Sequence, residues 1–231
     1  MSRRESELKF THEVHSSDNL LRSLQRTCNP DGKFQSNIIN SIYFDTHDWR
    51  LAMEKASSDY LKSKVRLRWY QSNNKNDQQT LSKCFLEFKR KIGSKREKTR
   101  IEMPFDGTSA ICEVQKPATQ RLLQEHIARN APDLVGFDLS AKILVQYTRH
   151  RFIEQMSNTR ISLDTNIKAS SIDRSFAQDF SKIRLKDAVL EVKGDCEDLP
   201  FALRRVNACN LKKAAFSKYY ESFVLLSGYQ Q

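Results

Sequence analysis

The sequence repeats one short charged pattern in three segments that lie far apart along the chain. A glutamate is followed two positions later by a lysine in the pairs Glu7/Lys9, Glu87/Lys89 and Glu191/Lys193. Residues two apart in a β-strand share a face, so each pair sets a carboxylate beside an ammonium group. Carboxylates bind hard divalent cations, and ammonium groups bind phosphate. The pattern predicts a site for a metal ion and a multiply charged anion.

Basic residues dominate the same face of other strand-like segments. Arg66 and Arg68 alternate with the apolar residues Val65, Leu67 and Trp69. Charged faces also arise from Lys98 with Arg100, Tyr147 with Arg149, and Arg160 with Ser162 and Asp164. The solvated face of an ordinary sheet is the alternative reading. A lining filled by a polyanion and a metal ion is favoured, because crowded like charges need counter-charges.

Strand-like segments dominate the elements that would position these residues. Alternating polarity predicts strands over 6–14, 37–45, 61–70, 84–91, 98–104, 143–155, 160–165 and 188–194. Helices are predicted over 18–26, 119–129, 201–209 and 217–226. We expect an α+β fold, an eight-stranded antiparallel β-barrel with helices packed outside, covering the apolar faces of the strands. Nothing resembles a linker, so a single domain over 1–231 is expected.

Composition limits the possible classes of protein. The chain has 231 residues, 39 Lys and Arg against 28 Asp and Glu, and a net charge of +11, so an anionic partner is expected. No apolar run approaches the ~20 residues of a membrane span, and no secretory signal is found. The five cysteines are scattered and predict free thiols in a cytoplasmic protein. The glycine pattern of a P-loop and the histidine spacing of a zinc protease are both missing.

These charged segments resemble the polyphosphate polymerase domain of the VTC (vacuolar transporter chaperone) family, within the triphosphate tunnel (CYTH-like) metalloenzymes. The resemblance rests on ELKF at 7–10, SIYFD at 41–45, VRLRWY at 65–70, FLEFK at 85–89, YTR at 147–149, RISLDT at 160–165, LEVK at 190–193 and FSKY at 216–219. The segments follow one another in family order over nearly the whole chain. The resemblance implies an eight-stranded antiparallel tunnel.

The resemblance also implies roles for individual residues. Phosphate contacts fall on Lys9, Arg66, Arg68, Lys89, Arg149, Arg160, Lys193 and Lys218, with Lys98 as a ninth that Arg100 could replace. Tyr147 and Ser217 are candidates to donate hydrogen bonds to phosphate, although a packed tyrosine and a helix cap are alternatives. The first candidate for metal ligation is Glu191, and further candidates are Glu5, Glu7 and Glu87. For Glu191 the alternative is a salt bridge to Lys193 or to a neighbouring arginine.

The function implied is a metal-dependent polyphosphate polymerase that transfers the γ-phosphoryl group of ATP to a growing chain inside a basic tunnel. The expected cofactor is Mn²⁺ or Mg²⁺, and the expected partners are ATP, phosphate and polyphosphate, not DNA. A tunnel-type triphosphatase or tripolyphosphatase is an alternative, as is a non-catalytic polyanion-binding module for RNA or polyphosphate. Trp69, Phe88 and Phe10 fall on apolar faces, which disfavours RNA, while Tyr70 and Tyr147 stay candidates for base stacking. A cytoplasmic location is expected, and docking on a separate membrane protein, with a peripheral position at a membrane, is a further hypothesis.

Overall fold

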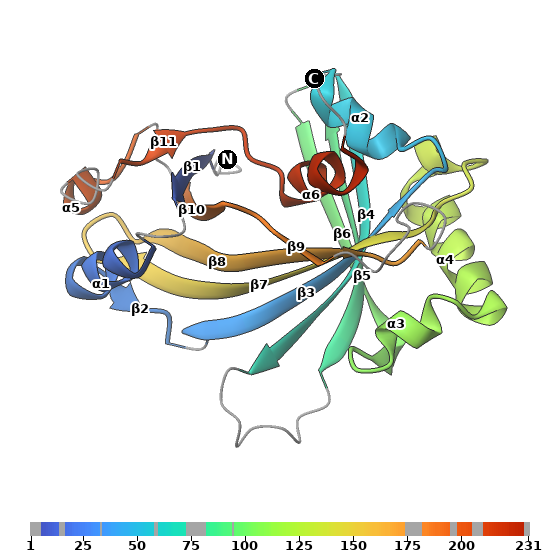
Figure 1. Cartoon of the computed structure of the whole chain (residues 1–231), viewed down its shortest axis with the longest axis horizontal. Coiled ribbons are helices and arrows are strands. Elements are labelled where there is room, and N and C mark those ends of the chain that lie inside the picture. Colours follow the sequence, from blue (N-terminus) through green and yellow to red (C-terminus); the bar gives the residue numbers. More distant parts are fainter. Residues whose placement is uncertain are drawn as a thin grey trace. The chain divides into compact units, whose positions relative to one another are not determined.

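The computed structural model describes residues 6–13, 17–32, 34–57, 60–72, 82–93, 95–173, 182–194, 198–204 and 210–228 (Figure 1). All eight predicted strands are present, with somewhat different ends. They are β1 (Ser6–Glu13), β3 (Ser36–Asp45), β4 (Leu61–Ser72), β5 (Lys83–Ile92), β6 (Lys95–Asp106), β7 (Ser140–Glu154), β8 (Thr159–Ser171) and β10 (Asp187–Gly194). Three short strands are not among those predicted: β2 (Asn29–Pro30), β9 (Lys182–Arg184) and β11 (Lys212–Lys213).

The strands form a single sheet. Its order is β11-β1-β10-β8-β7-β3-β4-β5-β6, with β2 beside β7 and β9 beside β8. The pairs β1/β10, β10/β8, β4/β5 and β5/β6 are antiparallel. The α+β class and the antiparallel sheet are therefore confirmed. Within the described ranges the order ends at β11 and β6 and no pairing joins them, so a closed barrel is not confirmed.

The helices occupy the connections between strands. They are α1 (Ser17–Thr27), α2 (Arg50–Ala56), α3 (Ala110–Glu113), α4 (Pro117–Asn130), the 3-10 turn η3 (Pro132–Leu134), α5 (Phe201–Arg204) and α6 (Lys218–Ser227). The predicted helices at 18–26, 119–129 and 217–226 are confirmed as α1, α4 and α6. The helix predicted over 201–209 begins as α5, and 205–209 lie outside the described residues. No helix of the described chain is long and apolar enough to cross a membrane.

The chain folds into two compact units that are each assembled from separate segments. Unit 1 comprises Met1–Ile38, Gln146–Lys168 and Arg184–Lys218, and unit 2 comprises Ile39–Val145, Ala169–Ile183 and Tyr219–Gln231. The single domain expected over 1–231 stays a prediction.

The core of unit 2 lies between the apolar face of β4 and β5 and the helices α3 and α4. Leu67, Leu86 and Phe88 are almost fully buried there. They belong to the same cluster as Leu123 and Ile127, which stand four residues apart on α4 and so share one helix face. The expectation that helices cover the apolar strand faces is confirmed for this unit.

The core of unit 1 has the same design. Leu163 and Leu190, from β8 and β10, cluster with Leu20 and Leu24 on α1 and with Leu203 on α5. Alternation of apolar and charged residues along β8 and β10 leaves their charged residues on the opposite face. The free cysteines among the described residues are Cys28, Cys84 and Cys112, and Cys196 and Cys209 lie outside them.

Helix α2 is absent from the sequence prediction because its cap is not local. Asp45, at the end of β3, accepts hydrogen bonds from the backbone amides of Leu51 (2.8 Å) and Ala52 (2.9 Å) in the first turn of α2. The Tyr219 hydroxyl of α6 donates to the same carboxylate at 2.6 Å. A capping residue six positions before the amide it binds is not a recognisable helix-start signal.

Candidate functional site

Unit 2 presents a charged face on three adjacent strands, which we call the β4–β6 face. The register places nine residues in three rows: Lys64–Lys89–Lys98, Arg66–Glu87–Arg100 and Arg68–Phe85–Glu102. Six of these residues are basic and two are acidic, so the face carries four net positive charges. Like charges directly opposite each other destabilise a sheet. The row of three lysines is therefore an arrangement that a bound anion would stabilise.

Glu87 stands at the centre of this face, and its side chain is fully buried. Arg66 donates to Glu87 Oε2 from Nη2 at 2.6 Å and from Nε at 2.9 Å. Lys98 Nζ and Arg100 Nε lie 3.3 and 3.7 Å from Oε1, and Arg68 Nη1 lies 3.9 Å from Oε2. Burial alone would raise the pKa of the Glu87 carboxyl, but the positive charges of Arg66 and Arg68 hold it well below its usual range.

Two hydroxyl groups orient the arginines of the β4–β6 face. Arg66 Nη1 donates to Tyr43 Oη at 3.2 Å, and Arg68 Nε donates to Ser41 Oγ at 3.0 Å. The Tyr43 ring stacks on Tyr219 with the ring centroids 4.6 Å apart. Burial alone would raise the pKa of Tyr43, but the charges of Arg66 and Arg68 lower it to about 8. Each guanidinium is thus held in one orientation before any ligand binds, which lowers the entropy lost on binding.

Unit 1 carries a second carboxylate with four basic neighbours. Glu191, on β10, lies 2.9 Å from Arg149 Nη2 and 3.6 Å from Lys218 Nζ. Lys9 Nζ and Lys193 Nζ lie 3.8 and 4.0 Å from it. Burial alone would raise the pKa of Glu191, but these neighbours, Arg149 first, hold it well below its usual range. Glu87 and Glu191, the two acidic residues of separate Glu-x-Lys pairs, therefore have the same kind of surroundings.

Asp164 on β8 is the closest carboxylate to both Arg149 and Lys218 in unit 1. Arg149 grips it with two hydrogen bonds of 2.6 Å, from Nε to Oδ1 and from Nη2 to Oδ2. Lys218 Nζ lies 2.6 Å from Asp164 Oδ2. Burial alone would lower the pKa of Lys218, but the charges of Asp164 and Glu191 raise it. Asp164 thus keeps Lys218 charged inside the unit and supplies the counter-charge of the buried Arg149 guanidinium.

Other predicted site residues lie around this group. Glu7 Oε1 is 3.5 Å from Lys9 Nζ and 3.7 Å from Lys193 Nζ. Arg160 stands directly opposite Lys193 in the β8/β10 register. These four residues place three positive charges and one negative charge on the same face of unit 1, which we call the β1–β10–β8 face.

The two predicted hydrogen-bond donors are both buried. The Tyr147 ring lies 4.9 Å from Lys218 Nζ, and Ser217 immediately precedes α6. Their predicted phosphate contacts stay predictions. Glu5 lies outside the described residues, so its predicted metal ligation is not addressed.

Lys64, Phe85 and Glu102 of the β4–β6 face are not among the predicted site residues, and neither are Tyr43, which contacts Arg66, and Asp164, which contacts Arg149. Asp164 and Phe85 each lie on the same strand face as predicted residues, so the two-residue period of the strands could have identified both. Tyr43 belongs to a segment that carries the family resemblance. Their roles depend on cross-strand register and on long-range pairing, such as that of Asp164 with Lys218, which the strand pattern does not give.

Comparison with known protein families identifies the family of this chain. The family model for the VTC domain matches residues 4–227, nearly the whole chain. The chain belongs to the VTC domain family. No curated protein matches the sequence. The VTC domain is similar to the X-ray structure of a putative adenylate cyclase from Vibrio parahaemolyticus, with 17% identity, a TM-score of 0.49, and 96% of this chain and 99% of that chain covered.

A second similar structure is the Mediator head module of Schizosaccharomyces pombe. Its identity is 12% and its TM-score 0.40, and 98% of this chain and 96% of that chain are covered. Both TM-scores lie below 0.5, so neither similarity establishes a shared fold or function.

The donor set for a divalent cation is sparse in this VTC domain. Among the residues that the structure describes, no three His, Cys, Asp or Glu side chains form a group that could hold a metal ion. Glu7 and Glu191 approach the same two ammonium groups, those of Lys9 and Lys193. Two carboxylates suit a cation that takes its remaining ligands from substrate phosphates and water. Glu7 and Glu191 are therefore the candidate ligands for such an ion.

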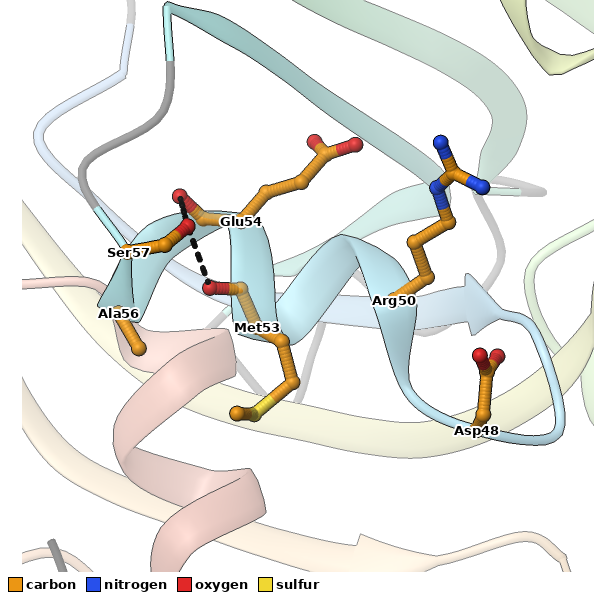
Figure 2. Close-up of a pocket in the computed structure, with 6 residues that line it drawn as sticks. All are labelled: Asp48, Arg50, Met53, Glu54, Ala56 and Ser57. Carbon is orange, nitrogen blue, oxygen red and sulfur yellow. Dashed lines mark hydrogen bonds between the residues drawn. The ribbon is translucent and has the colours of Figure 1, made fainter.

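A separate surface hollow follows helix α2 of the VTC domain (Figure 2). Its volume is about 570 Å³, and it is lined by Asp48, Arg50, Met53, Glu54, Ala56 and Ser57. Its two carboxylates and one guanidinium give it no positive excess. The hollow does not match the charge of a polyphosphate and contains none of the predicted site residues.

The buried carboxylates predict that the VTC domain loses stability in acid. Basic neighbours outweigh burial and lower the pKa values of Glu87, Glu191 and Asp164 in the folded state, below the unfolded values of about 4.3 for Glu and 3.9 for Asp. Such groups stabilise the fold fully above the unfolded pKa, and the contribution is lost as pH falls toward the folded pKa. Urea unfolding across pH should show the steepest loss below about pH 4. In Glu191→Gln this loss should be shallower, and an identical acid profile would contradict the assignment.

Proposed function

We propose that this VTC domain is a metal-dependent polyphosphate polymerase that transfers the γ-phosphoryl group of ATP to a growing polyphosphate chain. One observation carries the proposal: each unit surrounds a buried glutamate with four Lys or Arg groups on a charged strand face. Phosphoryl transfer needs positioning and charge neutralisation more than covalent chemistry. The closed tunnel around the phosphate chain stays a part of this proposal.

The side chains of each face would bind and orient phosphates. Arg66 and Arg68 have planar groups suited to a bidentate grip, while Lys98 and Lys218 act as point charges. A terminal phosphate oxygen of the growing chain attacks the γ-phosphorus of ATP. A new P–O bond forms as the bond to the β-phosphate oxygen breaks, and ADP leaves with that electron pair. This step transfers no proton, so the proposed mechanism needs no general base.

A divalent ion, Mn²⁺ or Mg²⁺, would be held by Glu191 with help from Glu7. When bound, it would offset negative charge on the phosphate oxygens and so ease the approach of one phosphate to another. Lys9 and Lys193, which contact both carboxylates, would then be available to the phosphate chain.

The test is to incubate the purified chain with ATP, phosphate and Mn²⁺ and to separate the products on a gel stained for polyphosphate. We expect a ladder of chain lengths that Arg66→Ala and Glu191→Ala each reduce by at least about a hundredfold. Arg129→Ala is the matched control, because Arg129 is highly exposed on α4. Circular dichroism should verify that each variant is folded.

The failures of this test have separate meanings. Metal-dependent phosphate release without a ladder would replace the polymerase by a triphosphatase, in which water attacks instead of phosphate. Tight polyphosphate binding with neither activity would leave a non-catalytic binding module. Wild-type activity in Glu191→Ala would remove Glu191 from the site.

A further inference from the structure

An aromatic side chain interrupts the charged β4–β6 face. Phe85 lies two residues before Glu87 on β5, between Arg68 on one neighbouring strand and Glu102 on the other. Trp69 and Phe88, by contrast, are buried in the core on the opposite face of the sheet. Phe85 is only half-buried. Its position among phosphate-binding charges therefore needs an explanation other than core packing.

Arg100 covers this aromatic ring. Its Cζ lies 3.6 Å from the centroid of Phe85, which is a stacking distance, and 5.5 Å from the centroid of Tyr70 on β4. Arg100 Nε also lies 3.7 Å from Glu87 Oε1, and the Arg100 side chain stays 38% exposed. The guanidinium is thus fixed on one side by Phe85 and by a carboxylate while part of it remains open to solvent. Planar guanidinium groups and aromatic rings of this kind stack nucleic-acid bases.

We propose that Arg100, Phe85 and Tyr70 form a stacking site for the base of a nucleoside triphosphate. The inference rests on the proposed function, since it assumes that the β4–β6 face binds the triphosphate. Phe85 is two residues from Glu87, which corresponds to about 7 Å along the strand. The stacking site therefore adjoins Arg66 and Arg68, and a ribose can bridge the two. The site makes the face select a nucleotide over an inorganic phosphate chain.

A single-stranded RNA is a weaker match for this site. RNA binding in such proteins uses several aromatic platforms on which successive bases stack. Trp69, Phe88 and Phe10 are buried, with at most 7% of their surface exposed. Tyr147 is buried beneath Lys218. On the β4–β6 face, the platform formed by Arg100, Phe85 and Tyr70 lies beside a triphosphate-sized cluster of positive charge, an arrangement that fits one base attached to one triphosphate.

The test compares equilibrium binding of ATP and of inorganic tripolyphosphate to the full chain. Phe85→Leu keeps an apolar side chain but removes the aromatic ring. Arg100→Lys keeps the positive charge but removes the planar guanidinium group. We expect each variant to weaken ATP binding by about 5- to 150-fold, the range for one stacked base. Tripolyphosphate binding should change by less than about threefold. Arg129→Lys, on the exposed surface of α4, is the matched control.

The failures of this test can be told apart. Equal weakening of ATP and tripolyphosphate by both variants would overturn the stacking site while leaving the proposed phosphate-binding function in place. Unchanged ATP binding in both variants would overturn it as well. Binding of neither ligand by the wild type would refute the proposed function and with it the stacking site. Thermal unfolding of each variant verifies that a weaker affinity does not reflect a loss of fold.

Discussion

Replacing Asp164 by alanine should lower the free energy of unfolding by about 3–5 kcal/mol, the usual cost of removing one partner from a buried ion pair. Asp164 is fully buried and receives Arg149 twice and Lys218 once at 2.6 Å. Without it, the two buried cations lose their closest carboxylate and keep Glu191 at 2.9 and 3.6 Å. Asp164→Asn should cost less, because the amide oxygen can still accept one hydrogen bond. Urea denaturation at about pH 7 measures both.

Ligand binding should reverse part of this loss. A ligand that binds only the folded state stabilises it by a free energy that grows with the logarithm of the ligand concentration divided by Kd. Phosphate oxygens can accept the hydrogen bonds that Asp164 leaves unmade, so tripolyphosphate should narrow the stability gap between the wild type and Asp164→Ala. Asp198→Ala, at an exposed position of unit 1, is the control and should change stability by less than about 0.5 kcal/mol. A comparably small loss in Asp164→Ala would show that Asp164 does not support Arg149 and Lys218.

The strand faces could be predicted from the sequence because they depend on a local period. Arg66, Arg68 and Glu87 alternate with apolar residues, and two-residue alternation is enough to assign each side chain to a face. The family resemblance added the residue types expected to bind phosphate. This combination anticipated both carboxylates that the structure places among four basic groups.

Register and closure depend on the whole chain and could not be predicted in this way. The position of Glu87 between Arg66 and Arg100 follows from how β4, β5 and β6 align, which no single strand specifies. Lys218 forms an ion pair with Asp164, which lies 54 positions earlier in the sequence. Closure of the sheet likewise requires two strands that end the observed order, β11 and β6, to be joined. Helix α2 was missed for the same reason, since Asp45 caps it from a strand.

The structure separates two possible roles of Glu87, a metal ligand and a structural counter-charge. Its Oε1 is buried and accepts no hydrogen bond from the described residues, which leaves a lone pair for a cation. Yet Lys98 and Arg100 already lie 3.3 and 3.7 Å from that oxygen. A divalent ion there would face four positive neighbours at close range, and their repulsion opposes binding. Four positive neighbours also surround Glu191, but Glu7 contacts Lys9 and Lys193, and Asp164 contacts Arg149 and Lys218, so two further carboxylates offset the repulsion there. Opposite Glu87 the register places arginines on both neighbouring strands. We therefore expect Glu87 to act as a counter-charge that holds the basic face together until a phosphate chain binds.

Glu87→Gln should consequently lower stability and raise anion affinity at the same time. Removing the charge from a buried group with four basic neighbours should cost about 3–5 kcal/mol of unfolding free energy. The β4–β6 face then gains one net positive charge, so tripolyphosphate should bind at least about fivefold more tightly without metal. Titration calorimetry with and without Mn²⁺ measures the affinities. Glu87→Asp, which keeps the charge, should retain wild-type affinity.

The effect of Mn²⁺ decides between the two roles. If Glu87 is a counter-charge, Mn²⁺ should strengthen tripolyphosphate binding in Glu87→Gln by the same factor as in the wild type. In Glu191→Gln the same enhancement should disappear, because that carboxylate, with Glu7, offers the donors that fit the ion. Loss of the Mn²⁺ effect in Glu87→Gln, with its retention in Glu191→Gln, would move the metal to the β4–β6 face. The two variants serve as controls for each other, because each removes the charge of one buried carboxylate that four basic groups surround.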